Sequence, residues 1–135
     1  MIRRSVVLAL AAIVCACGQA AERPRTSQAA SLTVNQTQEE IAEYLRAISQ
    51  REPVAEGVRQ RVRDGDDEAV ITADLIDISS GNVIGAATYT LTPAGEETRI
   101  TLQLSRMTGL YADVGRQEIL SNRIMALLRR DLGDV

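Results

Sequence analysis

Residues 68–105 read EAVITADLIDISSGNVIGAATYTLTPAGEETRITLQLS, and this segment decides the fold. Runs rich in β-branched residues are separated by SSGN at 79–82 and by PAGE at 93–96, sequences that are typical of turns. The pattern predicts strands at 68–78, 83–91 and 97–105. A fourth strand precedes them, because Val58, Gln60 and Val62 alternate with arginines before the turn sequence DGDD at 64–67. The sequence therefore predicts a four-stranded antiparallel meander.

Further elements are predicted on both sides of the meander. A short strand at 32–34 precedes a capping box formed by Thr37 and Glu40, which begins a helix over about 38–50 that stops before Pro53. A second helix is expected from 113 or 114 to 132, with Gly133 placed to terminate it. Its apolar stripe is Leu120, Ile124, Leu127 and Leu128. Because a sheet with one apolar face needs a cover, we expect an α+β domain over 31–135, with the long C-terminal helix packed on one face of the sheet.

The pairing register predicts which side chains lie beneath the helices, because a slip of one residue reverses every side chain. We place Ile78 opposite Val83 and Thr92 opposite Glu97. Gln60 then faces inward, since the alternative buries Arg59 without a partner. The expected covered face comprises Val58, Gln60, Val62, Val70, Thr72, Asp74, Ile76, Ile78, Val83, Gly85, Ala87, Tyr89, Leu91, Thr98, Ile100, Leu102 and Leu104.

Asp74 is the first candidate for a functional side chain, because this register surrounds its carboxylate with apolar residues. Desolvation raises the pKa of a carboxyl group and makes it a candidate acid, base or ligand anchor. The competing interpretation is a sheet end or bulge where Asp74 reaches water, or a structural hydrogen bond to Tyr89 or Gln60. The other polar candidates for the same face are Tyr89, Thr72, Gln60 and Arg106. Together they suit ligand binding better than catalysis.

The first eighteen residues have the form of an export signal. Two arginines precede an apolar segment at 5–14, which is too short for a transmembrane helix of about 20 residues. The following Val14-Cys15-Ala16-Cys17-Gly18 resembles the lipobox of bacterial lipoproteins, with Cys15 as a departure at a permissive position. The competing interpretation is an ordinary secretory signal that is cut near Ala20.

The lipobox resemblance implies that residues 1–16 are removed and that Cys17 is acylated. Residues 17–30 would then be the lipidated cysteine and a flexible tether, since they are polar and lack an apolar period. The resemblance further implies a domain that faces the periplasm from a membrane anchor in the cell envelope. The outer membrane is favoured over the inner one, because Gly18 is not aspartate.

Composition excludes several classes of function. Removal of Arg3 and Arg4 with the signal changes the formal charge from −3 to −5, so a nucleic-acid partner is not expected. The chain has no histidine, and both cysteines lie in the signal region, so we expect no zinc site, no activated nucleophile, no cofactor and no enzymatic activity. The acidic cluster Asp64, Asp66, Asp67 and Glu68 is interpreted as a solvated hairpin tip rather than a calcium loop, because Ala69 occupies the position where an EF-hand needs glycine.

The domain resembles the START-like (SRPBCC, helix-grip) superfamily. The likeness rests on the stretch from Leu32 to Leu45, a strand that leads into a helix, and on the turn and strand from Leu91 to Ile100. We expect five strands in this domain, whereas members of that family usually have seven. The resemblance implies a cavity between the sheet and the C-terminal helix that holds an apolar small molecule or lipid. The alternative is an envelope-assembly lipoprotein that holds a protein partner through its sheet edge or its arginine row, Arg59, Arg61 and Arg63.

Overall fold

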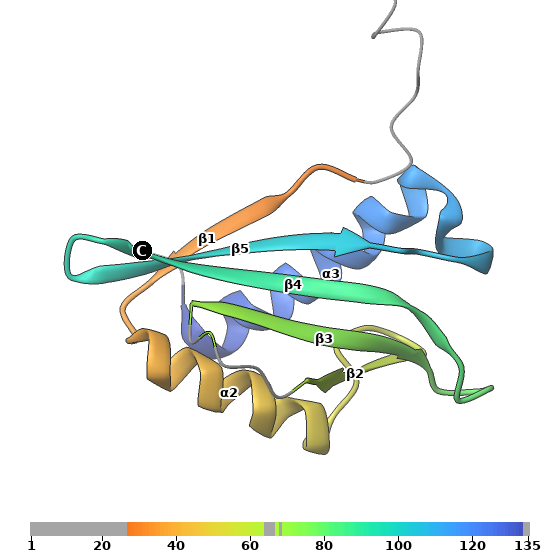
Figure 1. The fold of residues 1–135 in the computed structure, drawn as a ribbon, viewed down its shortest axis with the longest axis horizontal. Coiled ribbons are helices and arrows are strands. Elements are labelled where there is room, and N and C mark those ends of the chain that lie inside the picture. The colour runs from red at the N-terminus through yellow and green to blue at the C-terminus, as the bar shows by residue number, and fades with distance from the viewer. Residues whose placement is uncertain (1–26, 64–66, 68, 134–135) are drawn as a thin grey trace, which may run out of the picture.

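A computed structural model describes residues 27–63, 67 and 69–133 (Figure 1). The predicted signal, Cys17 and most of the acidic turn lie outside the described residues. The elements are β1 (Ala30–Val34), α2 (Gln38–Arg51), β2 (Val58–Val62), β3 (Val70–Asp77), β4 (Val83–Ala94), β5 (Glu97–Ser105), the 3₁₀ turn η1 (Gly109–Ala112) and α3 (Val114–Leu132). The α+β class is confirmed.

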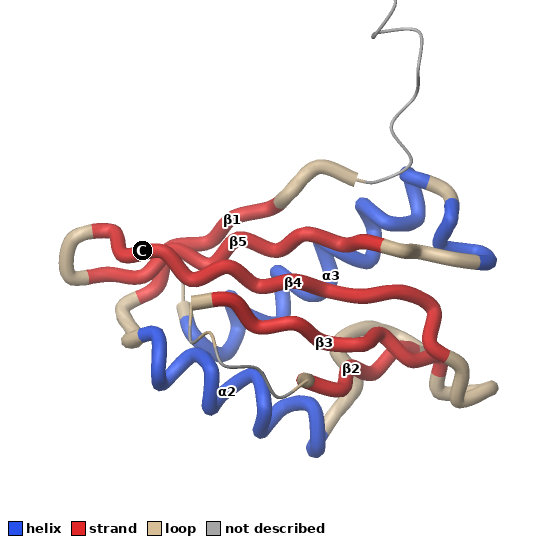
Figure 2. Tube along the Cα trace, viewed as in Figure 1, coloured by secondary structure: helices blue, strands red, loops and turns tan. Residues whose placement is uncertain are grey.

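The five strands form one antiparallel sheet in the order β1-β5-β4-β3-β2. Strands β2 to β5 form the meander and lie next to one another in sequence order. Strand β1 pairs with β5, with Leu32 opposite Ile100. Figure 2 shows the two helices packed against the sheet, α2 near β2 and α3 near β1 and β5. The core therefore lies between the helices and one face of the sheet, and the described residues place no helix on the other face.

Local sequence signals account for the ends of both helices. Thr37 accepts a hydrogen bond from the Glu40 amide, and the Glu40 carboxylate accepts one from the Thr37 amide, so the capping box begins α2 as predicted. Asp113 caps α3 by accepting a hydrogen bond from the Arg116 amide. Gly133 ends α3 with φ of 81°, a conformation that glycine adopts without a steric penalty.

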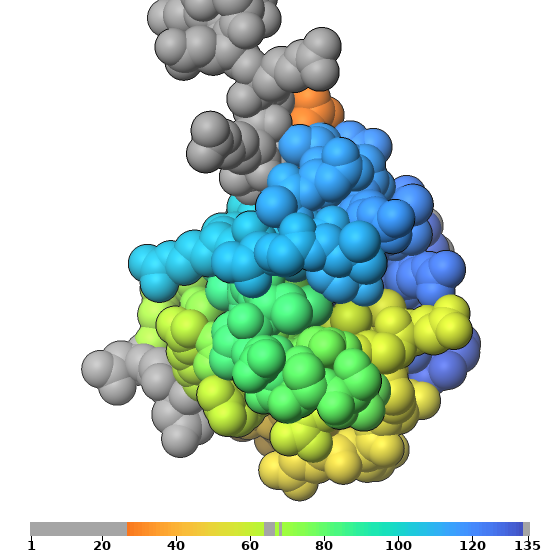
Figure 3. Space-filling view, turned by 90° about the vertical axis from the view of Figure 1, so that its right-hand side faces the viewer, coloured from red at the N-terminus to blue at the C-terminus, as the bar shows by residue number. Residues whose placement is uncertain are grey.

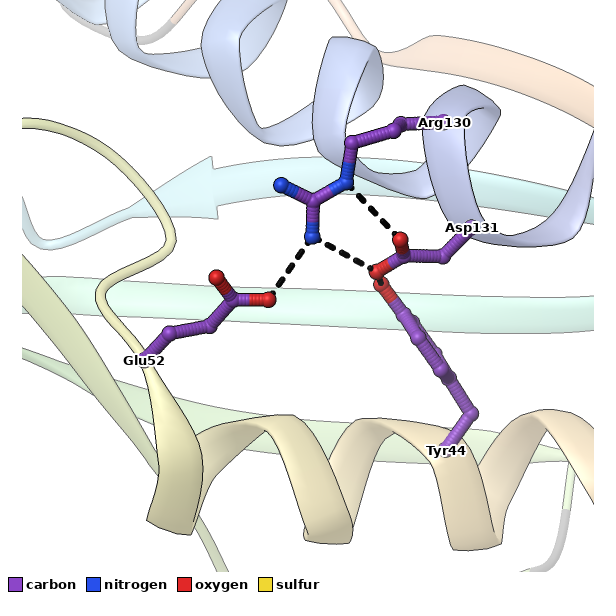
Figure 4. Close-up of polar contacts among 4 residues, drawn as sticks. All are labelled: Tyr44, Glu52, Arg130 and Asp131. Atoms are coloured by element: carbon purple, nitrogen blue, oxygen red, sulfur yellow. Dashed lines mark hydrogen bonds and ion pairs between the residues drawn. The ribbon is translucent and has the colours of Figure 1, made fainter.

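The carboxyl ends of the two helices are joined by a polar cluster (Figure 4). The Tyr44 hydroxyl of α2 donates a hydrogen bond of 2.5 Å to the Asp131 carboxylate of α3. Arg130 donates to Asp131 at 2.8 Å and to Glu52 at 2.7 Å. The hydrogen bond from Arg130 contributes most to the lowered pKa of Asp131. The cluster links α2 to α3, and none of its four residues lines the groove described below.

The predicted register is wrong for β3 and for Val83, which is 51% exposed, and right for the inner faces of β2, β5 and the rest of β4. Ile76 pairs with Val83, but Leu75 pairs with Gly85, so a bulge at this point leaves Ile84 as an extra residue in β4. Because of the bulge, the β3 side chains that were expected to point away from the helices point toward them. Ile71, Ala73 and Leu75 therefore enter the core, whereas the prediction buried Val70, Thr72 and Asp74 there.

The other pairings keep the predicted inner faces. Thr92 pairs with Arg99 rather than Glu97, but this shift of two residues leaves the facing of β4 and β5 unchanged. Tyr89 and Leu102 are fully buried, as predicted. On β2, Gln60 faces inward while Arg59 is exposed, which confirms the choice that avoided unpaired buried arginines.

Candidate functional site

The polar residues predicted to line one site lie in three separate places. Gln60 and Tyr89 are both buried beneath α2, where the Tyr89 hydroxyl donates a hydrogen bond of 2.6 Å to Gln60 Oε1. Burial raises the pKa of Tyr89, so the hydroxyl remains neutral and acts as a hydrogen-bond donor. Thr72 lies with Asp74 on the face of the sheet away from the helices, and Arg106 is exposed after β5.

Asp74 is an ion-pair residue of the outer sheet face. Its carboxylate accepts hydrogen bonds from Arg61 Nη2 at 3.1 Å and from Arg63 Nε at 2.9 Å, and Arg63 Nη2 also contacts it. The hydrogen bond from Arg63 is the largest cause of a lowered Asp74 pKa, against a smaller opposing effect of desolvation. The expectation of a raised pKa is wrong, because the bulge places the carboxylate beside arginines. Two of the three arginines in the predicted row are thus engaged within the domain.

A groove runs across the end of the domain that contains η1 and the β3–β4 turn. One part, of about 270 Å³, lies between α3 and the loop before β2, and the adjoining part, of about 710 Å³, lies between that loop, the β3–β4 turn and η1. Both parts share Glu56 and Tyr111, so we treat them as one feature, the end groove. Figure 3 looks onto this end of the molecule. The lining residues are Ala55, Glu56, Gly57, Asp77, Ser80, Asn82, Val83, Ile84, Thr108, Gly109, Leu110, Tyr111, Arg116, Ile119, Leu120 and Arg123.

Exposed apolar side chains gather around the end groove. Val83 is 51% exposed, Leu110 60% and Ile119 56%, and all three line it. Ile78 is 48% exposed and lies beside it, since its amide donates to the carbonyl of Gly57. In the described part of the chain, the remaining large apolar side chain with high exposure is Val70, at the other end of β3. Contiguous exposed apolar patches are a general feature of interaction surfaces, whereas single exposed apolar residues are normal on any protein.

Polar groups of the end groove are mixed in charge. Arg116 and Arg123 project from α3, and Arg123 forms an exposed ion pair of 3.4 Å with Glu56. The described residues contain no group of three or more His, Cys, Asp or Glu side chains that is placed to hold a metal ion. Sequence periodicity missed this groove, because turns and a 3₁₀ segment supply most of its lining.

The chain enters the domain beside the end groove. The Ser27 amide donates a hydrogen bond of 2.9 Å to Gln117 Oε1, and Gln117 Nε2 donates one of 2.9 Å to the carbonyl of Tyr111. Gln103 Nε2 donates to the Ser27 carbonyl at 2.8 Å. Gln117 is 1% exposed, so it forms a buried link between the start of the described chain and the groove lining. Figure 1 shows this entry point at the same end as η1.

Comparisons with known proteins found no match among family models, curated proteins or solved structures. Within the described ranges, neither helix is both long and apolar enough to cross a membrane.

Proposed function

We propose that this protein is a lipid-anchored protein of the cell envelope whose α+β domain binds an apolar ligand or lipid in the end groove. The observation that carries the proposal is the position of Ser27, which enters the domain next to an apolar-rimmed groove. An anchor at Cys17 would hold this end of the domain close to the bilayer.

The length of the proposed tether supports this orientation. Nine residues lie between Cys17 and Ser27, so ten Cα-to-Cα steps join them and reach at most about 35 Å. A flexible chain of ten residues has an average span of about 17 Å, whereas a domain of this size has a radius of gyration of about 13 Å. The end groove is thus nearer to the bilayer, on average, than the opposite end of the sheet. Tethering also raises the effective concentration of lipid at the groove.

The dimensions and lining of the end groove suit binding. Ligand sites commonly measure about 300–1,000 Å³ and combine apolar walls with a few polar groups. The START-like resemblance implies a cavity between the sheet and the C-terminal helix, but Tyr89 and Leu102 on that face of the sheet are fully buried in the core, so we place the ligand in the end groove instead. An apolar chain lying along Leu110 and Ile119 would cover side chains that are now in water, and burial of apolar area is favourable by about 25 cal/mol per Å².

A protein partner is the second candidate for this surface. The same exposed side chains, together with a filled core, favour an envelope protein that covers Leu110 and Ile119. The two candidates differ in what the purified protein carries. Native mass spectrometry of the exported protein is expected to show bound lipid if the groove binds an apolar ligand. It is expected to show no added mass if the groove binds a protein partner instead.

The anchor is tested by metabolic labelling with a palmitate analogue. Wild-type protein is expected to incorporate label and to sediment with membranes, and Cys17→Ser is expected to lose both properties. Intact-mass analysis of the exported chain checks its first residue. A mature chain that starts elsewhere and carries no fatty acid would overturn the anchored assignment.

The orientation is tested with a tryptophan reporter, since the chain contains no tryptophan. Acylated protein bearing Leu110→Trp is reconstituted into vesicles of phosphatidylcholine brominated in its acyl chains. We expect the emission of the Leu110→Trp variant to be quenched, because the groove rim contacts the acyl region. Val70→Trp, at the far end of β3, is the matched control and should remain bright. Equal quenching of both variants, or of neither, would contradict the proposed orientation while leaving the anchor itself intact.

A further inference from the structure

A second pocket lies at the edge of the sheet, between the C-terminal half of α2 and the edge strand β2. It measures about 330 Å³ and is lined by Arg46, Ser49, Gln50, Arg59, Gln60, Arg61 and Val62. We call it the β2-edge pocket. Among the described residues β2 is the last strand of the sheet, and on its outer side only an isolated bridge joins Ala55 to Val58.

The lining of the β2-edge pocket is basic. Three arginines contribute to it and no acidic residue does. Arg61 is engaged with Asp74 through Nη2. Arg46 and Arg59 are exposed, and the described residues offer neither of them an ion-pair partner. The pocket therefore presents two unneutralised guanidinium groups from different elements to one small volume.

The inner wall of the pocket holds an unpaired buried donor. Gln60 is 1% exposed, and its Oε1 accepts from Tyr89, but no described residue provides a hydrogen-bond partner for its Nε2. Reversing the amide would let Nε2 donate to the Tyr89 hydroxyl oxygen, but it would leave both the Gln60 Oε1 and the Tyr89 hydroxyl hydrogen without a partner, so the orientation with Oε1 toward Tyr89 leaves fewer groups unpaired. A buried donor without a partner is unfavourable, and an acceptor bound in the pocket would remove that cost.

We propose that the β2-edge pocket binds a phosphate group. Guanidinium groups bind phosphate through paired N–H donors, and two unneutralised arginines match the charge of a phosphate dianion. Gln60 Nε2 supplies a neutral donor from the core side. This site is separate from the end groove and does not depend on the anchor at Cys17.

The experiment titrates the exported protein, held in a neutral detergent, with inorganic phosphate at constant ionic strength. Isothermal titration calorimetry measures the affinity, with chloride as the reference anion. Loss of charge-assisted hydrogen bonds in Arg46→Gln/Arg59→Gln is expected to weaken phosphate binding by roughly tenfold or more. The matched control, Arg51→Gln/Arg99→Gln, removes two exposed arginines outside the pocket and should bind like wild type.

A second measurement follows the Gln60 side-chain amide directly by ¹H–¹⁵N NMR. Its Nε2 protons are expected to shift with phosphate and not with chloride. A short-chain lysophosphatidic acid, titrated in parallel, distinguishes the source of the group: shifts with both ligands indicate a free phosphate compound, and shifts with the lipid alone indicate a headgroup. Unchanged Gln60 signals with both, or equal affinity in the two double variants, would overturn the proposal.

Discussion

At the scale of single residues, Asp74 shows how a carboxylate on the outer face is kept charged. Its carboxylate pairs with an arginine of β2, Arg61, and with Arg63, which follows β2. Asp74 is only 7% exposed, although the side chains of both partners are half-exposed. Ion pairs with exposed partners are screened by water and contribute at most about 1 kcal/mol. The pair therefore adjusts the stability of the β2–β3 hairpin without dominating it.

Acid titration of Asp74→Asn tests this assignment. The folded pKa of Asp74 lies below its ordinary value, so its contribution is present above about pH 4, the unfolded pKa, and is lost as pH falls through the folded pKa. Relative to wild type, the variant should be less stable by up to about 1 kcal/mol at pH 7, and the difference should shrink as the pH falls below about 4. Urea unfolding across pH measures it. Glu43→Gln, on the exposed side of α2, is the control, and a pH-independent difference for Asp74→Asn would contradict the ion-pair role.

At the scale of elements, Gly85 sets how closely the chain after β5 approaches β4. A Cβ at this position would lie 2.2 Å from Met107 Sδ and 3.2 Å from Met107 Cα. The Met107 side chain can rotate, but its backbone cannot retreat freely, because the following Thr108 amide donates to the Ile84 carbonyl at 2.9 Å. Glycine is therefore needed here for space, and the contact positions the segment that leads into η1 and the end groove.

We expect Gly85→Ala to destabilise the domain by about 1–3 kcal/mol through overpacking. Gly85→Ala/Met107→Ala should recover part of that loss, because removal of the thioether relieves the closest contact. Thermal unfolding followed by circular dichroism measures both variants against Met107→Ala alone. Additive losses in the double variant would show that the two residues do not compete for the same space.

At the scale of the whole molecule, one face of the sheet carries the core and the other is polar. Leu91 is buried beneath the helices, while its neighbour Thr92 is exposed on the outer face. The described residues contain no cysteine, so the domain relies on packing rather than on disulfide bonds. Stability should consequently respond very differently to substitutions at adjacent positions of one strand.

Leu91→Ala is expected to cost about 2–5 kcal/mol, because it leaves a cavity in a packed core. Thr92→Ala should change the free energy of unfolding by no more than about 0.5 kcal/mol. Urea denaturation of the two variants measures the contrast. A large loss for Thr92→Ala would show that a further layer covers the outer face in the native protein.

The sequence by itself determined the α+β class, the helices and strands in their order, and the ends of both helices, because these depend on short-range signals such as the Thr37–Glu40 capping box, the glycine at 133 and the apolar period of α3. It also determined the inward facing of Gln60 and Tyr89, since burial of unpaired arginines opposed the other choice. Only the tertiary structure decided the facing of β3, because one extra residue at Ile84 reverses the strand while both of its faces carry apolar side chains. The end groove and the β2-edge pocket likewise depend on three-dimensional packing: their residues come from turns and from elements distant in sequence, where no periodic pattern marks them.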